Sequence, residues 1–189
     1  MKYFRQLIGK KVYLTPPSVD DAPKYCQWLN DMEIIINLQT DWSLSVERER
    51  ELLTNLINQT NVKLFGIVDS KTDKLLGSCG LHDIDLINGS AQFGIFIGDK
   101  NYHGKGYGTE ATHLILDFGF NVMNLYNIYL SVYSYNESAI KSYLKAGFKE
   151  IGRRRKARQI NDNRYDIVFM DIIRDEFSSP FIGKIMPKL

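Results

Sequence analysis

The decisive stretch of this sequence is HGKGYGTEA, His103 to Ala111, which places three glycines within six residues. The strand-like segment AQFGIFIG precedes it, and an amphipathic segment follows it. Glycine permits positive φ and lets a ligand approach the backbone without a Cβ in the way. A strand that leads through such a turn into a helix presents the unpaired N–H groups of the first helical turn, which favour anions. The stretch therefore predicts a loop that wraps a phosphate or pyrophosphate.

Three other interpretations of the glycine stretch fit less well. A turn that only reverses the chain needs one or two glycines rather than three. The nucleotide P-loop pattern G-x-x-x-x-G-K-[ST] fails because Thr109 and Glu110 follow Gly108, where a lysine is required. The dinucleotide pattern G-x-G-x-x-G fails on spacing, because Gly108 comes only two residues after Gly106. We therefore expect an anion site of another kind.

Length and composition predict one globular domain. The chain has 189 residues, of which 44% are hydrophobic and 24% are charged, and we assign residues 1–176 to the domain and 177–189 to a C-terminal tail. A formal net charge of +2 gives no field that would attract nucleic acid, and no apolar run is long enough to span a membrane. We expect a cytoplasmic protein with neither a nucleic-acid nor a membrane partner, and a homodimer stays open.

The cysteines and histidines do not predict a metal site. Cys26 and Cys79 stand alone, and neither lies at ligand spacing from His82, His103 or His113. We expect both cysteines to be small buried residues, which is the commonest state of a free cysteine. The prediction is a protein without a metal cofactor.

Hydrophobic periodicity predicts an α+β fold with a mixed sheet. Ser18 starts one helix that turns Tyr25, Trp28 and Leu29 to one side, and Asn136 starts another that ends near Gly147. Strands are expected at 11–15, 62–69, 75–85, 91–98 and 127–134, and in a final pair around the turn 159–163. The order of helices and strands does not follow the regular alternation of a doubly wound fold.

Two further helices are expected on either side of the central strands. One begins near Ser45 and carries Leu52, Leu53, Leu56 and Ile57 at helical spacing. The other follows the glycine stretch, and Thr109 is its expected N-cap. Its inward-facing residues are predicted to be Ala111, Leu114, Ile115, Phe118 and Val122.

Two blocks of this sequence resemble a known family. Gly104-Lys-Gly106-Tyr-Gly108 resembles the Q/R-x-x-G-x-G/A signature of the Gcn5-related N-acetyltransferases, and 136–148 is similar to their N-x-x-A-x-x-x-Y-x-K-x-G-F block. The segments VYLTPPSVDDAPKYCQWLND and GRRRKARQINDNRYDIVFMDIIRDEF are similar to the branch that acetylates ribosomal-protein N-termini and, in relatives, polyamines or aminoglycosides. The resemblance implies the GNAT-like acyl-CoA N-acyltransferase fold, with a central, mostly antiparallel sheet flanked by helices.

The resemblance also implies acetyl-CoA as co-substrate and assigns residues to it. The pantetheine arm and thioester are expected beside Ile95, Phe96 and Ile97, where an N–H near Phe96 or Ile97 donates to the thioester carbonyl. The pyrophosphate is expected on the backbone of His103, Gly104, Lys105, Gly106, Tyr107, Gly108 and Thr109. Asn136 is expected to cap its helix and to contact the cofactor.

Tyr143 is the predicted general acid, which protonates the CoA thiolate as it leaves. A core tyrosine is the alternative, because the helix that carries it must pack. Many relatives have a glutamate where this chain has Gln92, and an amide cannot accept a proton. His82 is therefore the candidate base, although His82, Asp83 and Asp85 are each typical of a strand end. A side chain at position 103 varies among relatives, so a catalytic His103 is not expected.

The acceptor is expected to be a primary amine on a peptide or protein N-terminus, or on a small molecule such as a polyamine. A peptide needs an open groove between the first two helices and the last hairpin, whereas a polyamine favours acids such as Glu33, Asp41 and Glu47. The basic run 153–158, RRRKAR, is expected to alternate between the two faces of a strand. A noncatalytic acyl-CoA-binding module and an RNA-binding strand remain the alternative functions.

Overall fold

The structure is a computed structural model that describes residues 3–38, 43–178 and 181. Within these residues, eight strands form one sheet in the order β1-β2-β3-β4-β5-β6-β8-β7. Neighbouring strands are antiparallel except β5 and β6, which are parallel. The predicted mixed sheet is therefore confirmed. The strands are β1 Leu7–Ile8, β2 Val12–Thr15, β3 Lys63–Asp69, β4 Leu75–Asp85, β5 Ser90–Ile97, β6 Asn127–Tyr133, β7 Lys149–Ile160 and β8 Asn163–Ile173.

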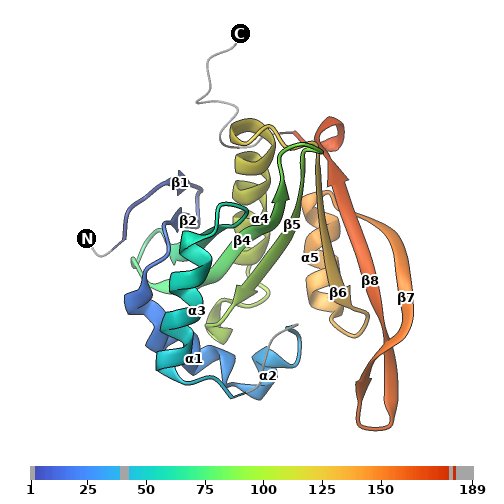
Figure 1. Ribbon diagram of the computed structural model, residues 1–189, viewed down its shortest axis with the longest axis horizontal. Helices are drawn as coiled ribbons and strands as arrows, with labels where there is room; N and C mark the ends of the chain where they lie inside the picture. The colour runs from blue at the N-terminus through green and yellow to red at the C-terminus, as the bar shows by residue number, and fades with distance from the viewer. Residues whose placement is uncertain (1–2, 39–42, 179–180, 182–189) are drawn as a thin grey trace.

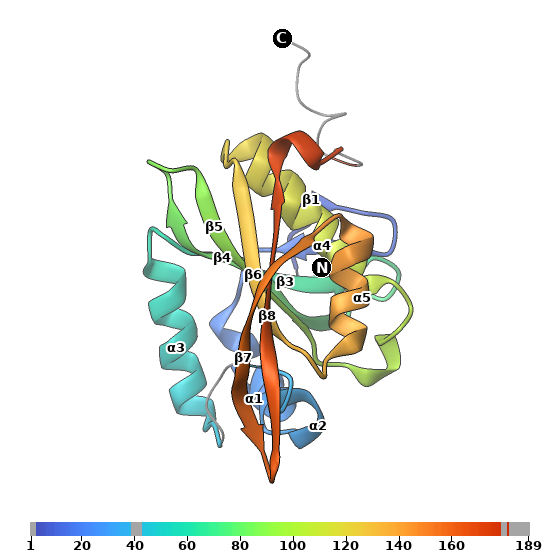
Figure 2. The same ribbon diagram turned by 90° about the vertical axis from the view of Figure 1, so that its right-hand side faces the viewer.

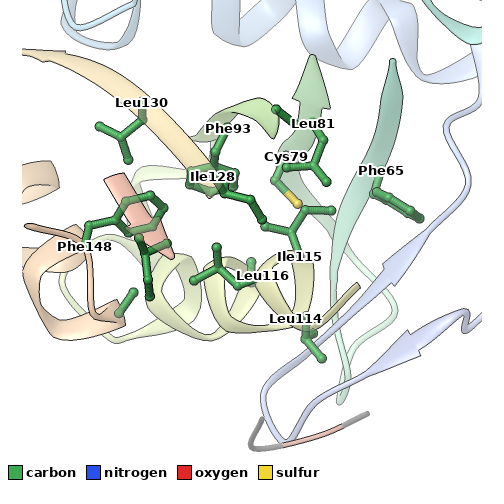
Figure 3. Packing of buried hydrophobic residues seen from close by; sticks show 14 of the residues in the cluster. Phe65, Cys79, Leu81, Phe93, Leu114, Ile115, Leu116, Ile128, Leu130 and Phe148 are labelled. Atoms are coloured by element: carbon green, nitrogen blue, oxygen red, sulfur yellow. The ribbon is translucent and has the colours of Figure 1, made fainter. Parts of the chain in front are cut away.

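Helices cover both faces of this sheet (Figure 2). Helices α1 (Ala22–Leu29), α2 (Met32–Ile35) and α3 (Val46–Asn58) contribute to a core on one face, around Tyr13, Tyr25 and Trp28. Helices α4 (Tyr107–Asp117) and α5 (Glu137–Ala146) cover the other face, where Leu114, Ile115 and Phe148 pack among buried residues of the central strands (Figure 3). Each face therefore has its own apolar core.

Strand β5 contributes side chains to both cores because successive residues of a strand point to opposite faces. Phe93 is buried in the core under α4 and α5, and Ile95 and Ile97 pack against the same core. Phe96 points the other way, where its ring centroid lies 6.0 Å from that of Tyr25 and 6.3 Å from that of Trp28. The two helical layers are thereby fixed to the same strand.

The parallel pair of β5 and β6 is short. It runs from Ser90 opposite Asn127 to Gln92 opposite Tyr129. Beyond this point β5 continues in register with β4 as far as Ile97, whereas β6 continues in register with β8 as far as Tyr133. The two strands therefore diverge toward their carboxyl ends, as Figure 1 shows. The sheet is split at this place, and both strand edges there lack a neighbouring strand.

Several predicted details of the helices are wrong. Helix α4 begins earlier than expected, because Gly106, with φ of 82°, is its N-cap in place of Thr109. Val122 is 45% exposed instead of inward, since a π-helical turn at Phe118–Val122 changes the angular spacing of the side chains. In α3 only Leu53 among the expected apolar residues is buried, while Leu52 and Ile57 are 40% and 42% exposed.

Other boundaries agree with the sequence. Ser45 caps α3 by accepting a hydrogen bond from the Arg48 N–H, and Gly147 ends α5 with φ of 102°. Cys26 and Cys79 are free and buried, as predicted. Of the predicted tail, Phe177 and Phe181 pack against the core, and the Phe181 N–H donates to Asp117 Oδ2 over 3.0 Å. Residues 179–180 and 182–189 of the predicted tail lie outside the described part of the chain.

Gly98, just after β5, tests the packing of α1 on this strand. A Cβ at Gly98 would lie 2.0 Å from Cδ2 and 2.3 Å from Cγ of Trp28, and the indole cannot bend away. We expect Gly98→Ala to lower the free energy of unfolding by about 1–3 kcal/mol, because overpacking forces strain on its neighbours. Urea denaturation measures the change. Gly152→Ala is the control, since its Cβ would meet no atom within 4 Å, and equal stability losses in the two variants would contradict the packing.

Candidate functional site

The glycine loop forms a cradle at the N-terminus of α4. Gly104 and Gly106 have φ of 68° and 82°, which L-residues rarely adopt, and a Cβ at Gly104 would have no neighbour within 4 Å. The N-cap Gly106 has no side chain to bond the first-turn N–H groups of Tyr107, Gly108 and Thr109. Those groups and the positive end of the helix dipole therefore face an open loop, which is the predicted arrangement for an anion.

Two lysines and a pocket lie beside this cradle. Lys105 is exposed, and its backbone carbonyl accepts a hydrogen bond of 2.7 Å from Lys11 Nζ. Lys11 Nζ also lies 5.7 Å from the centre of the Tyr107 ring. A pocket of about 380 Å³ opens next to the loop and is lined by Asp69, Lys74, Asn101, Tyr102, Lys105 and Tyr107. The loop thus combines free backbone donors with nearby positive charge.

Side-chain hydrogen bonds hold the loop and α4 in place. His103 Nε2 lies 2.8 Å from the Ile97 carbonyl oxygen, and because a carbonyl only accepts, this nitrogen carries the proton. Glu110 Oε1 accepts from the backbone N–H groups of Lys11 and Val12, at 2.6 and 3.1 Å. His103 therefore positions the loop on the end of β5, in agreement with the expectation that it is not a catalyst.

Strand β5 turns alternate backbone groups toward the split. The Phe96 carbonyl oxygen faces β4, since a Cβ at Gly77 would lie 2.0 Å from it, and the Gly98 N–H also bonds to β4 at Leu76. In an antiparallel ladder the neighbouring residues face the opposite edge. The backbone groups of Ile95 and Ile97 therefore point to the split, and Ile97 is the better placed of the two predicted carbonyl-binding donors.

Tyr143 lies at the point where the strands part. Its ring centroid is 6.2 Å from that of Phe93, the first β5 residue after the last β5–β6 pair, and 5.9 Å from that of Phe148. Burial raises the pKa of Tyr143 to about 12. No residue in the described ranges accepts a hydrogen bond from its hydroxyl.

The helix of Tyr143 is tied to the helix of the glycine loop. Asn136 is the N-cap of α5, as predicted, and its Oδ1 accepts from the Ala139 N–H over 3.2 Å. Thr109 Oγ1 and Ser142 Oγ lie 2.8 Å apart and share a hydrogen bond between α4 and α5. The loop and the tyrosine therefore belong to one rigid arrangement.

The candidate base lies on the other face of the sheet. His82 pairs in register with Gln92 and lies against Gly94, so it shares their face, whereas Phe93 and Tyr143 lie on the opposite one. Burial lowers the pKa of His82, which keeps the imidazole neutral at pH 7. A neutral imidazole can accept a proton. The structure therefore does not bring His82 and Tyr143 into contact, but it places them on opposite faces of the sheet at β5.

Glu49 is a buried acid that was not among the residues predicted from the sequence. This carboxyl is on α3, is 6% exposed and has its pKa raised to about 7 by burial. Its charge also raises the pKa of the Cys26 thiol on α1, although burial is the larger cause there. The sequence of α3 gave no signal for a buried acid, because Glu47, Glu49 and Glu51 alternate with basic residues.

The basic run does not alternate as expected. The register of β7 against β8 shifts between Arg154 and Arg158, so this part of the strand bulges, and Lys156 has φ of 52°. Asp166 Oδ1 holds the bulge by accepting a hydrogen bond of 2.9 Å from the Lys156 N–H. Because a bulge breaks the alternation, Arg153, Arg154, Arg155 and Lys156 all border one hollow of about 580 Å³.

The described residues contain no group of three or more His, Cys, Asp and Glu side chains that could hold a metal ion. None of the helices in residues 3–38 and 43–178 is long and apolar enough to cross a membrane. Asp41, one of the acids proposed to favour a polyamine, lies outside the described residues.

A sheet split between β5 and β6, with the uncapped N-terminus of α4 beside the split, agrees with the class of acyl-CoA-dependent transferases that the sequence blocks predict. Residues 11–149 match the model of the acetyltransferase (GNAT) domain family, and the chain belongs to this family. The predicted family, fold class and acetyl-CoA-dependent acetyltransferase activity are therefore confirmed.

Particular relatives extend the similarity over most of the chain. The probable N-acetyltransferase YjcK of Bacillus subtilis is 32% identical over 82% of this chain and 90% of its own. The spermidine N(1)-acetyltransferase of Escherichia coli is 37% identical over 53% of this chain and 54% of its own. The crystal structure of spermidine N-acetyltransferase from Vibrio cholerae in complex with CoA and spermine has a TM-score of 0.81 at 26% identity, covering 89% and 98% of the two chains.

Glu49 predicts a pH dependence of stability. Its pKa is about 7 in the folded protein and about 4.5 when unfolded, so the folded state binds the extra proton between these values and stability falls as pH rises through them. We expect Glu49→Gln to remove this fall. As the pH rises from 5 to 8, the free energy of unfolding of the variant should increase by about 2–3 kcal/mol relative to that of the wild type. Urea unfolding at several pH values measures it. The exposed Glu51→Gln is the control, and identical pH slopes for Glu49→Gln and wild type would contradict the burial of a carboxylate here.

Proposed function

We propose that this protein transfers the acetyl group of acetyl-CoA directly to a primary amine, with Tyr143 as general acid. The observation that carries the proposal is the contact between Tyr143 and Phe93 at the first residue past the β5–β6 pair. A phenol held there is within reach of a group that enters the split from the β5 edge. The glycine loop lies at the end of the same strand, connected to it by His103.

The residues present fit acetyl-CoA. Gly104 and Gly106 leave the loop backbone open to a pyrophosphate, and the N–H groups of 107–109 together with Lys105 supply donors and charge. The edge N–H and carbonyl of Ile95 can pair with the amides of the pantetheine arm, since the Ile97 carbonyl already accepts from His103. When bound, the co-substrate supplies the activated thioester. The Ile97 N–H is then the donor that stabilises negative charge on its carbonyl oxygen.

Tyr143 is suited to the acid role by its protonation state. With a pKa of about 12, its hydroxyl holds its proton at neutral pH and can give it to a thiolate that leaves. Burial also raises the pKa of Cys79, which therefore stays a thiol and is no nucleophile. These two states favour attack by the amine itself over transfer through an acylated cysteine.

The acceptor must lose a proton before it attacks. His82 is neutral and lies on the face of Gln92, from which an acceptor can reach the split opposite Tyr143. An α-amine, with a pKa of about 8, needs less help from such a base than an alkyl amine does. The spermidine acetyltransferases among the relatives support a polyamine as one acceptor class, and a polypeptide N-terminus is the other.

Removing the Tyr143 hydroxyl tests the acid role. We expect Tyr143→Phe to lower kcat by about 100-fold or more, the usual contribution of a general acid, while KM for acetyl-CoA changes little. Release of CoA thiol is followed with acetyl-CoA and a panel of N-terminal peptides, polyamines and aminoglycosides. Tyr126→Phe is the control, because Tyr126 bonds Asp175 away from the split. An unchanged kcat in Tyr143→Phe would contradict the role of Tyr143 as general acid. The absence of CoA release with every amine would contradict the proposed acetyl transfer.

The glycine cradle has its own test. Gly104→Ala adds a Cβ that meets no atom, so its only direct cost is the left-handed backbone at φ of 68°, about 1–2 kcal/mol. We expect KM for acetyl-CoA to rise by about 5- to 30-fold, since that strain opposes the loop conformation that binds it. Gly152→Ala serves again as the control. A KM unaltered by Gly104→Ala, measured with the best amine of the panel, would place acetyl-CoA elsewhere.

A further inference from the structure

The bulged β7 segment carries an excess of positive charge that the proposed transfer does not use. Arg153, Arg154, Arg155 and Lys156 are all exposed and border one hollow. Glu150 pairs with Arg153 over 2.6 Å, and Asp166 uses Oδ1 to accept the Lys156 N–H. These six residues together keep an excess of two positive charges. Within the described ranges, Arg154, Arg155 and Lys156 form no salt bridge.

The segment is held rigidly rather than on a free loop. Ser134 and Asp166 exchange two hydrogen bonds, Ser134 N–H to the Asp166 carbonyl over 3.0 Å and Asp166 N–H to Ser134 Oγ over 3.1 Å. Arg158, at the end of the bulge, lies over the Tyr133 ring at 4.9 Å. The bulge is thereby fixed to the carboxyl end of β6, which is one side of the split.

Sheet register gives the distance from the split to this segment. Tyr133 of β6, Ile167 of β8 and Arg154 of β7 lie in one row across three strands. Two strand spacings separate Tyr133 from Arg154, which is about 10 Å. An extended peptide advances about 3.3 Å per residue. A peptide whose terminal amine enters the split near Leu130 would therefore reach the basic hollow with its fourth to sixth residues.

Two acids at α2 share a single lysine. Glu33 in α2 and the N-cap Asp31 both pair with Lys100, at 2.5 and 2.7 Å, so the three groups together keep one net negative charge. Tyr135, which follows β6, donates from its hydroxyl to the Ile36 carbonyl over 2.5 Å and so connects α2 to the side of the hairpin. The hairpin extends past the sheet at this same end (Figure 1). A polycation therefore meets an excess of two positive charges at the β7 hollow, against one net negative charge at the acidic pair of α2.

From this arrangement we infer that the acceptor is an N-terminal polypeptide segment with carboxylates four to six residues from its amine, docked on the basic hollow of β7. This rests on the proposed acetyl transfer to an amine and specifies its substrate class. The charges favour an acidic peptide over a nucleic acid, because the cations form one compact hollow rather than a track along many phosphates. The hollow would bind the peptide downstream of its terminal amine, so docking should affect peptide binding and leave the transfer step at the split unchanged.

Matched peptides test the inference. One peptide carries Asp or Glu at positions four to six, and its partner carries Asn or Gln there with the same first three residues. We expect the wild-type KM for the acidic peptide to be lower by about 3- to 10-fold, as for a small network of exposed ion pairs, and the difference to shrink in high salt. The double variant Arg154→Gln/Arg155→Gln should raise KM for the acidic peptide by the same factor and leave the amide peptide and acetyl-CoA unchanged.

Controls separate this inference from the proposed function. Lys145→Gln on the exposed side of α5 should change neither peptide, and spermidine should be acetylated with a lower KM in the double variant, because repulsion is removed. Equal KM values for both peptides in the wild type, with spermidine still acetylated, overturn the docking surface alone. Failure of every amine to release CoA overturns the transfer. An RNA oligonucleotide that binds tightly, and loses binding in the double variant without an effect on peptide KM, assigns the surface to nucleic acid and overturns the inference.

Discussion

The ending of the β5–β6 pair at Gln92 and Tyr129 is the constraint on which the rest of the structure depends. Each strand keeps its outer partner beyond that point, so the backbone edge of β5 at Ile95 and Ile97 loses its neighbour on one side. Backbone donors and acceptors at such an edge need partners. An extended ligand with amide groups can provide them, which is why we propose the split as the binding site although the described residues form no large cavity there.

Both layers of helices pack against β5 beside this split. On one face Phe93 carries the contact to Tyr143, and on the other Phe96 packs against Tyr25 and Trp28 of α1. The loop that follows β5 is tied back to it through His103 and continues into α4, which is joined to α5 by Thr109 and Ser142. The glycine loop and Tyr143, the proposed sites of anion binding and proton transfer, are therefore both held in fixed positions relative to β5.

Local patterns in the sequence predicted most of the strands and helices. They failed where contacts between residues distant in the sequence determine the local structure. The strands, the cap at Asn136 and the left-handed Gly147 follow from propensity and spacing within a few residues. Gly106 rather than Thr109 begins α4, because two glycines with positive φ let the helix start one turn earlier. The two-residue β1 and four-residue α2 are too short to show a period and were missed.

The π-turn at 118–122, the burial of Glu49 and the bulge at Lys156 also depend on tertiary contacts. The bulge is held by Asp166, ten residues away on the neighbouring strand. Hydrophobic periodicity gives no information on such a contact between strands. The candidate site was predictable at the glycine loop, Asn136 and Tyr143 because those residues stand in two sequence blocks, whereas the joint placement of four cations around one hollow needed the fold.

The most direct measurement of the central claim is a crystal structure of this protein with CoA bound. We predict that the pyrophosphate contacts the N–H groups of residues 104–109 and that the pantetheine arm pairs with Ile95. The sulfur should lie within about 3.5 Å of Tyr143 Oη, as a proton donor requires. A sulfur far from Tyr143, or a pyrophosphate held away from the glycine loop, would contradict it.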